Sequence, residues 1–321
     1  MAVRLALAGD TMLGRSVAEQ LARDPRHELL TADLAATARD ADLFVLNLEC
    51  CISDRGQYVR DPEHGFFFRA PPVAAERLAE LGVTCATLAN NHVLDFGPEA
   101  LQDTVGHLRR AGIAAVGAGP DEAAARAPVV LVGGGLRVRV VAASDHPSDY
   151  AAGPDRPGVA FADLHRRAIP AWLRECAEPG SDADVTIVSP HWGPNMRAEP
   201  VAHVRRAAAA LEEAGATLVA GHSAHVPHGP SGRTLFDLGD FIDDYAVHPL
   251  LRNDLGLLWL VTLDAGGPLR VEGVPVKLEF ARTRAASHVE ATVLLALLEE
   301  RCAAVGSSVR REGDRLVFES P

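Results

Sequence analysis

The stretch AGDTMLG at residues 8–14 follows a hydrophobic run and places Asp10 at the mouth of an expected buried strand. An Asp in this place often caps the helix that follows the strand. The carboxyl ends of strands in open α/β sheets are also the places where ligands and metals bind. The residues that follow the other strands indicate whether Asp10 is a helix cap or a metal ligand.

Composition indicates a globular protein, with 321 residues, of which 48% are hydrophobic, and a formal net charge of -12. This charge disfavours binding to nucleic acid or to an anionic membrane surface. No run reaches the roughly 18 continuous apolar residues of a membrane span, and the first residues lack a signal-peptide pattern. The five cysteines show no paired framework. We therefore expect a cytoplasmic protein with no nucleic-acid or membrane partner, in an oligomeric state that the sequence leaves open.

Short apolar runs alternate with longer amphipathic ones, a rhythm typical of an α/β protein with a mostly parallel or mixed sheet. The expected strands are residues 3–8, 43–48, 84–88, 113–117, 137–143, 184–189, 217–220 and 233–238. The expected helices are residues 15–23, 72–81, 98–111, 163–176, 199–214 and 287–304. Hairpins are expected at 130–141 and 255–280, and a long surface loop at 145–158. We assign residues 1–285 to one metal-site domain, with a C-terminal helix and small hairpin, 286–321, packed on it.

Polar side chains follow five of these strands at the point where each strand ends. They are Asp10, then Asn47 and Glu49, then Asn90, His92 and Asp95, then His191, and finally His222, His225 and His228. Carboxylate, amide and imidazole donors together are the ligand set of a hydrolytic divalent-metal site. Each residue alone has an ordinary explanation as a cap, a turn residue or a core histidine. Their joint occurrence favours a metal site, with His228 behind the ligands or at the surface.

The segments GDTMLGR, NLE, LANNHVLDFG, HWG and GHSAHVPHG occur in this order along the chain. In order and separation they resemble the CapA-like family of capsule and poly-γ-glutamate synthesis, over about residues 3–245. That family is itself similar to the calcineurin-like metallophosphoesterases. The resemblance implies a calcineurin-like four-layer α/β/β/α sandwich.

The resemblance also implies roles for single residues. Two metal positions bridged by Glu49 would be held by Asp10 and His225 on one side, and by Asn90, His191 and His222 on the other. His92 would protonate a leaving group, a role that suits imidazole near neutral pH.

Two departures from the phosphoesterase pattern reduce the expected ligand set. Met12 stands where those enzymes carry a histidine, and Val93 stands where a Glu follows the Asn-His pair. The site would then bind one ion or two. The mixture of oxygen donors and histidines admits Mn²⁺, Ca²⁺, Fe or Zn²⁺.

Three functions are compatible with this pattern. A phosphoesterase would use the metal to activate water and hold the phosphate. An isomerase would exchange a proton at Cα of a residue in a ribosomally made peptide of the lasso type, an activity that the resemblance also covers. It would use a base and an acid on opposite faces, chosen from Asp10, His92, Asp95 and His288, with Asp240 as a further partner. A non-catalytic assembly protein would keep the metal as a structural clip.

We favour the peptide epimerase over the phosphoesterase and over a capsule biosynthesis protein. The missing nitrogen ligand weakens the case for a binuclear hydrolase, and the link to poly-γ-glutamate points to peptide-like substrates. The acidic run DLGDFIDD, residues 237–244, would also repel a phosphate, unless it is a solvated surface loop, which is the ordinary interpretation of such a run.

Overall fold

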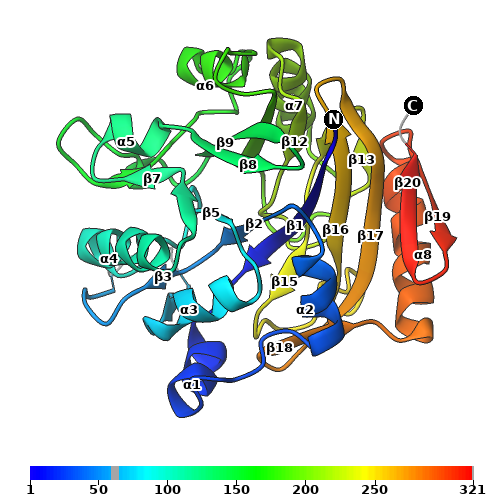
Figure 1. Cartoon of the computed structure of the whole chain (residues 1–321), viewed down its shortest axis with the longest axis horizontal. Coiled ribbons are helices and arrows are strands. Elements are labelled where there is room, and N and C mark those ends of the chain that lie inside the picture. The colour runs from blue at the N-terminus through cyan, green and yellow to red at the C-terminus, as the bar shows by residue number, and fades with distance from the viewer. Residues whose placement is uncertain (59–64, 320–321) are drawn as a thin grey trace.

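The computed structural model describes residues 1–58 and 65–319 and has four layers (Figure 1). Two sheets lie face to face, and helices cover the outer face of each sheet. The predicted α/β class and calcineurin-like α/β/β/α sandwich are confirmed. The division of the chain at residue 285 stays a prediction.

The larger sheet carries the first candidate ligands on its parallel half. Its parallel strands, in spatial order, are β15 (Asp240–Ile242), β1 (Val3–Thr11), β2 (Leu43–Leu48), β5 (Cys85–Thr87) and β6 (Ala114–Val116). Beyond β1 the sheet continues antiparallel through β16 (Leu255–Asp264), β17 (Gly267–Glu279), β20 (Arg315–Glu319) and β19 (Ser308–Glu312), with β18 (Arg282–Ala285) also paired to β17. The predicted hairpin over 255–280 is thus β16 with β17.

The smaller sheet carries the histidines. Its strands, in spatial order, are β13 (Pro230–Ser231), β14 (Thr234–Leu235), β12 (Leu218–Ala220), β11 (Val185–His191), β9 (Leu136–Ser144) and β8 (Val129–Gly133). The strands β9, β11, β12 and β14 run parallel, so their carboxyl ends share one edge. Two short pairs lie outside both sheets: β3 (Cys51–Ile52) with β4 (Arg69–Ala70), and β7 (Ala118–Gly119) with β10 (Gly158–Val159).

The helices form the two outer layers. The outer face of the larger sheet is covered by α1 (Arg15–Arg23), α2 (Ala32–Arg39), α3 (Val73–Glu80) and α4 (Gly97–Arg110). The outer face of the smaller sheet is covered by α6 (Ala171–Ala177) and α7 (Ala202–Ala214). Three further elements are α5 (Glu122–Arg126), the 3₁₀ turn η1 (Ser148–Tyr150) and α8 (His288–Ala303). A capping box between Ser287 and Glu290 starts α8.

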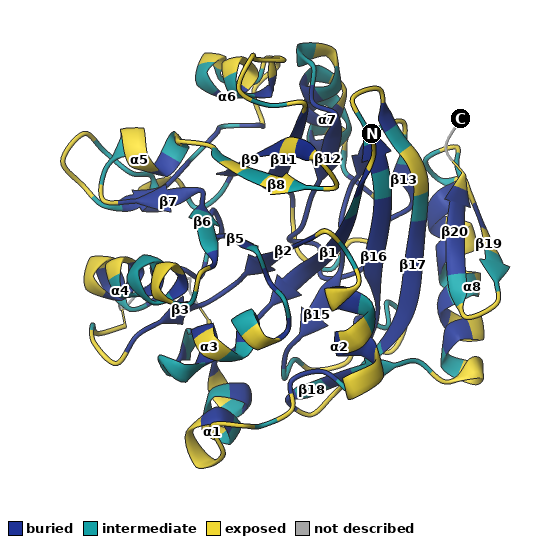
Figure 2. Ribbon diagram, in the orientation of Figure 1, coloured by how far each residue is buried: buried dark blue, intermediate teal, exposed yellow. Residues whose placement is uncertain are grey.

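The strands are apolar on both faces because each sheet is buried on both sides. In β1, Leu5 and Leu7 face the core between the sheets, and Ala6 and Ala8 face the helices. Figure 2 shows the result, with buried strands inside and exposed helix faces outside. Leu294 of α8 joins the core between the sheets. Within the described residues, no helix combines the length and apolarity that a membrane crossing requires.

Two sequence predictions differ from the structure near the smaller sheet. The helix predicted over 163–176 forms only as α6, Ala171–Ala177, because Pro170 disfavours helical backbone at the residue before it. Residues 163–170 are therefore a loop. The loop predicted at the surface over 145–158 is in part buried, since Asp145 is 5% exposed and Tyr150 is 9% exposed. Both differences matter for the side chains described below.

Candidate metal centre

The candidate ligands meet where the carboxyl ends of the two sheets face each other. The larger sheet supplies Asp10 at the end of β1 and Glu49 directly after β2, and the smaller sheet supplies His191 at the end of β11. His222 and His225 lie in the turn after β12. We call Asp10, Glu49, His191, His222 and His225 the Asp10 centre.

Asp10 is not a helix cap. The residue before α1 is Gly14, and no side chain caps that helix. Gly9 before it is required by close backbone contact, since a Cβ there would lie 1.9 Å from the carbonyl oxygen of Gly239. A register shift between Ala8 and Asp10 turns the Asp10 side chain beside Asn47 of β2. Asp10, in the stretch 8–14, therefore does not cap the helix that follows β1.

His191 and His222 form a neutral pair. Their Nδ1 atoms are 2.8 Å apart, and Oδ1 of Asp10 lies 3.9 Å from Nδ1 of His222. Burial lowers the pKa of His191 well below its usual value and that of His222 to about 4. Two uncharged imidazoles beside a carboxylate offer the nitrogen and oxygen donors that divalent transition metals bind.

His225 lies between two carboxylates. Its Nδ1 is 2.8 Å from Oδ1 of Asp240 and 3.1 Å from Oδ2 of Asp10. Burial lowers the pKa of His225, but the neighbouring carboxylates, Asp240 first, raise it well above the usual value. A protonated His225 therefore supplies positive charge beside Asp10. Asp10 belongs to two groups of potential ligands, one with His191 and His222 and the other with His225 and Asp240. Within each group, one ligand atom from each residue lies within 4.8 Å of the others.

Glu49 is the observation that most favours a bound cation. Its side chain is fully buried, and neither of its carboxylate oxygens has a hydrogen-bond partner among the described residues. Oε1 lies 4.0 Å from Nε2 of His191. Burial, and then the charge of Asp10, raise the pKa of Glu49 well above its usual value. A buried, unpaired carboxylate is unfavourable unless a cation pairs with it, so the donor set fits a divalent metal ion.

Two asparagines support the centre from the larger sheet. Nδ2 of Asn47 donates to Oδ1 of Asp10 at 2.8 Å, and Nδ2 of Asn90 donates to Oδ1 of Asn47 at 3.0 Å. Oδ1 of Asn90, the predicted metal ligand, accepts the backbone N–H groups of His92 and Val93, each at 3.0 Å. Both acceptor positions of this oxygen are therefore in use, and ligation by Asn90 stays a prediction.

A cavity of about 270 Å³ opens beside the centre, lined by Arg15, Phe66, Phe68, His92, Asn195, Met196, His225, Tyr245, Ala246 and Asn253. His92 reaches it with its Nδ1 held 2.8 Å from Oδ2 of Asp95, as the predicted acid pair requires. Sequence patterns missed Arg15, Met196 and Tyr245. Arg15, Met196 and His225 have positive φ of 49°, 55° and 62°. Such backbone is uncommon for residues other than glycine and gathers at functional sites, but it leaves no signal in the sequence.

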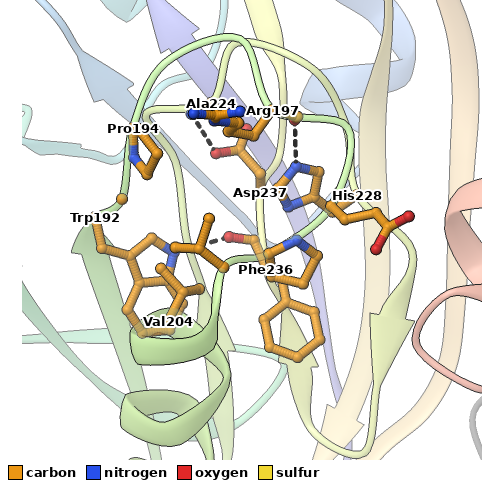
Figure 3. A pocket seen from close by; sticks show the side chains of 12 residues that line it. Trp192, Pro194, Arg197, Val204, Ala224, His228, Phe236 and Asp237 are labelled. Carbon is orange, nitrogen blue, oxygen red and sulfur yellow. Dashed lines mark hydrogen bonds between the residues drawn. The ribbon is translucent and has the colours of Figure 1, made fainter.

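The structure places two predicted residues elsewhere. His288 is exposed in the first turn of α8 and is not among the residues that line the cavity, so a catalytic role for it stays a prediction. His228 is not at the surface: it is 3% exposed, and its Nε2 donates to the carbonyl of Arg197 at 2.8 Å. Figure 3 shows His228 facing Arg197 across a small pocket, with the Trp192 indole bonded to the Phe236 carbonyl. The first bond holds the segment after His191 against the turn after β12, and the second holds it against the residue that follows β14.

The acidic run 237–244 is not a solvated loop. Asp237, Asp240 and Asp243 are buried, at 1%, 1% and 6% exposure. Oδ2 of Asp237 accepts the backbone N–H of Ala224 at 2.7 Å, next to His225. Burial raises the pKa of Asp240, and it raises the pKa of Asp237 and of Asp243 well above the usual value, so these groups favour the neutral acid unless a cation lies beside them.

Known proteins are similar to most of this chain. The family model described as bacterial capsule synthesis protein PGA_cap matches residues 4–245. A probable polyglutamine synthesis accessory protein, present in two strains of Mycobacterium tuberculosis, is 35% identical over 296 residues, covering 86% of this chain and 76% of the relative.

Two Bacillus proteins are more distant. The PGA biosynthesis protein CapA of Bacillus subtilis is 25% identical over 242 residues, covering 74% of this chain and 62% of that protein. The capsule biosynthesis protein CapA of Bacillus anthracis is 25% identical over 248 residues, covering 75% of this chain and 59% of that protein. The family match includes every residue of the Asp10 centre. The chain therefore belongs to the bacterial capsule synthesis protein family, PGA_cap.

Proposed function

We propose that this chain is a divalent-metal-dependent hydrolase that cleaves an amide bond in a peptide-like, carboxylate-bearing polymer of the capsule type. The observation that carries the proposal is the unpartnered, fully buried Glu49 carboxylate beside the neutral pair His191 and His222. The relatives named for polyglutamine, PGA and capsule synthesis supply the substrate class. This proposal replaces the epimerase as our first choice.

The residues present suit one ion better than two. Asp10, His191 and His222 would hold it, because one ligand atom from each lies within 4.8 Å of the others. Glu49 would complete the set, since it is buried and its Oε1 lies 4.0 Å from Nε2 of His191. His225 already supplies positive charge between Asp10 and Asp240, where a second ion would otherwise be needed. When bound, the ion would polarise the substrate carbonyl and lower the pKa of an attacking water.

The cavity residues have the chemistry for the remaining steps. His92, held by Asp95, lines the same cavity as His225 and would deliver a proton to the departing amine, since an amine leaves only when protonated. Arg15 lines the cavity with its guanidinium 5.4 Å from the centroid of the Phe66 ring and its Nε 3.5 Å from Oδ1 of Asp244. Its side chain is 41% exposed, so the guanidinium still presents positive charge to the cavity. That charge suits a substrate carboxylate.

The proposal is tested with chelator-treated protein reloaded with Mn²⁺ and given a synthetic γ-linked glutamate oligomer, an α-linked oligomer and nitrophenyl phosphate. We expect cleavage of the γ-linked oligomer only with metal present, and a loss of at least about 100-fold in Glu49→Gln, because the ion loses a buried ligand. His107→Ala, in α4, is the matched control. Preferred cleavage of nitrophenyl phosphate would instead identify a phosphoesterase.

Peptide epimerisation remains the second candidate, favoured by one specific observation. Two histidines backed by carboxylates, His92 with Asp95 and His225 with Asp240, line the same cavity. Proton exchange at Cα needs such a pair of acid and base groups. The same incubation in deuterated water separates the two reactions, because deuterium at Cα without chain cleavage would establish the isomerase and exclude the hydrolase.

A further inference from the structure

A second group of metal-binding side chains lies behind the Asp10 centre and shares no residue with it. Asp145 follows β9, His165 lies in the loop 163–170, and His203 lies in the first turn of α7. One ligand atom from each residue lies within 4.8 Å of the others. We call these three residues the Asp145 cluster.

The two imidazoles of the cluster converge on one carboxylate oxygen. Nε2 of His203 is 3.2 Å from Oδ2 of Asp145, and Nε2 of His165 is 3.9 Å from the same oxygen. The two rings stack with centroids 3.9 Å apart. A single hydrogen bond to Asp145 would require only one of these rings. The second ring is turned to the same point from a different segment of the chain.

The carboxylate is held in place before any ligand arrives. The Asp145 side chain is fully buried, its Oδ2 accepts the backbone N–H of Gly193 at 3.2 Å, and its Oδ1 lies against Nδ1 of His146. Its own backbone N–H donates to the carbonyl of His191 at 3.0 Å. The cluster is therefore built on the chain segment that carries a ligand of the Asp10 centre.

The positive charge nearest the loop does not compete for the carboxylate. Arg206, one turn after His203 in α7, donates from Nη2 to the carbonyl oxygens of His165 and Arg166, at 2.8 and 3.2 Å. Arg166 pairs with Asp163 at 2.7 Å. The His165 side chain is 63% exposed, so an ion can approach from solvent and keep water in its remaining coordination positions.

We propose that Asp145, His165 and His203 form a second metal site, separate from the Asp10 centre, that takes a divalent transition metal ion of the zinc class. A site of two imidazole nitrogens and one carboxylate oxygen binds Zn²⁺ or Co²⁺ in preference to Ca²⁺ or Mg²⁺, which favour oxygen ligands. The bound ion ties the loop 163–170 and α7 to the end of β9. Through His146, whose ring centroid is 5.1 Å from that of His191, it also braces the wall of the Asp10 centre.

The test is a titration of the chelator-treated full chain with Co²⁺, followed by its visible absorption and by equilibrium dialysis. We expect two classes of bound ion. His165→Ala removes one class and leaves the other, and Glu49→Gln does the reverse. His107→Ala, in α4, changes neither. The absorption spectra of the two single-site variants sum to that of the unmodified protein.

The variant His203→Gln separates the loss of a metal ligand from a loss of folding. Its amide N–H can still donate to Asp145, but an amide is a poor ligand for Co²⁺. We expect a folded protein, judged by circular dichroism, that has lost the same class of ion as His165→Ala. The inference is overturned if both variants bind as much Co²⁺ as the unmodified protein, or if Glu49→Gln abolishes all binding. Either result leaves the hydrolase proposal standing, because that proposal depends on the Asp10 centre only.

Discussion

The Asp10 centre and the Asp145 cluster use the same kinds of side chain in different surroundings. In the Asp10 centre Glu49 is completely buried and lacks hydrogen-bond partners among the described residues. In the Asp145 cluster the carboxylate is equally buried, but the Gly193 N–H and His146 contact its oxygens, and His165 is open to solvent. The first group depends on a cation to pair its charge, whereas the second is stable without one and has room for one. Unpaired charge, more than ligand type, therefore distinguishes a site that requires a metal from a site that accepts one.

The sharpest way to break this comparison is to remove one carboxylate charge from each group and measure unfolding by urea with chelator present. Glu49→Gln is expected to raise the free energy of unfolding by about 1–3 kcal/mol, because it removes an unpaired buried charge. Asp145→Asn is expected to lower it by about 1–3 kcal/mol, because one of the two bonded acceptor oxygens becomes an amide nitrogen.

The pH dependence gives the sign of the Glu49 effect. Its pKa is raised in the folded protein, so its contribution to stability is present at low pH and is lost as pH rises through the folded value. The gain from Glu49→Gln should therefore grow with pH. Equal destabilisation by both substitutions would remove the distinction between the two groups.

The segment between the two groups offers a test through His228, which holds Arg197 and is 3% exposed. Burial lowers its pKa from 6.5 to about 4. The unfolded chain then binds more protons between those values, so the free energy of unfolding falls as pH drops through this window, by about 3 kcal/mol at most. His228→Gln should flatten that part of the curve of unfolding free energy against pH. An unchanged slope would show that His228 is not buried in the neutral form.

A substitution of Asn47 tests whether the Asp10 centre can be weakened without an effect on the Asp145 cluster. Its side chain joins Asp10 and Asn90 through bonds of 2.8 and 3.0 Å. Asn47→Ala is expected to lower metal affinity and turnover by about 10- to 100-fold, the usual effect of losing a residue that orients a ligand. Metal dialysis and steady-state kinetics measure both. Co²⁺ bound at the Asp145 cluster should not change, and its loss would show that the two sites are not independent.

The smallest effect is expected at Arg15, on the cavity wall, whose side chain is 41% exposed. Arg15→Ala should raise KM for a carboxylate-bearing oligomer by about two- to fivefold, the range of an exposed ion pair. The change in kcat should be smaller, because Arg15 touches neither the proposed ion nor the acid pair. Amide-capped oligomers should show no such difference, and an equal KM change for both substrates would exclude a carboxylate at this position.

Much of the Asp10 centre could be predicted from the sequence because parallel strands end at a common edge. Asp10, Glu49 and His191 each stand at or directly after a strand whose apolar run is visible, so their convergence follows from the order of the strands. His222 and His225 follow the apolar run of β12 in the same way, and the family resemblance added an expected metal position for each. His288 lies exposed at the start of α8, because a helix start that follows a strand in sequence need not lie at that edge.

The Asp145 cluster could not be predicted in the same way. His165 was assigned to a helix that Pro170 prevents, and Asp145 to a surface loop that folds inward. His203 lies on α7, where a histidine carries no signal of its own. Only the packing of α7 and the loop 163–170 against the end of β9 brings these three residues together.

The sequence by itself determined which segments form strands, the order of these strands along the chain and the donor atoms at their ends. Apolar runs and strand-end residues are local features of the chain, so a sequence pattern shows them. The tertiary structure alone decided that His225 lies between Asp10 and Asp240, that Glu49 has no partner among the described residues, and that the acidic run is buried. The physical reason is that burial and charge pairing depend on which segments meet across the two sheets. No local sequence pattern shows which segments will come into contact.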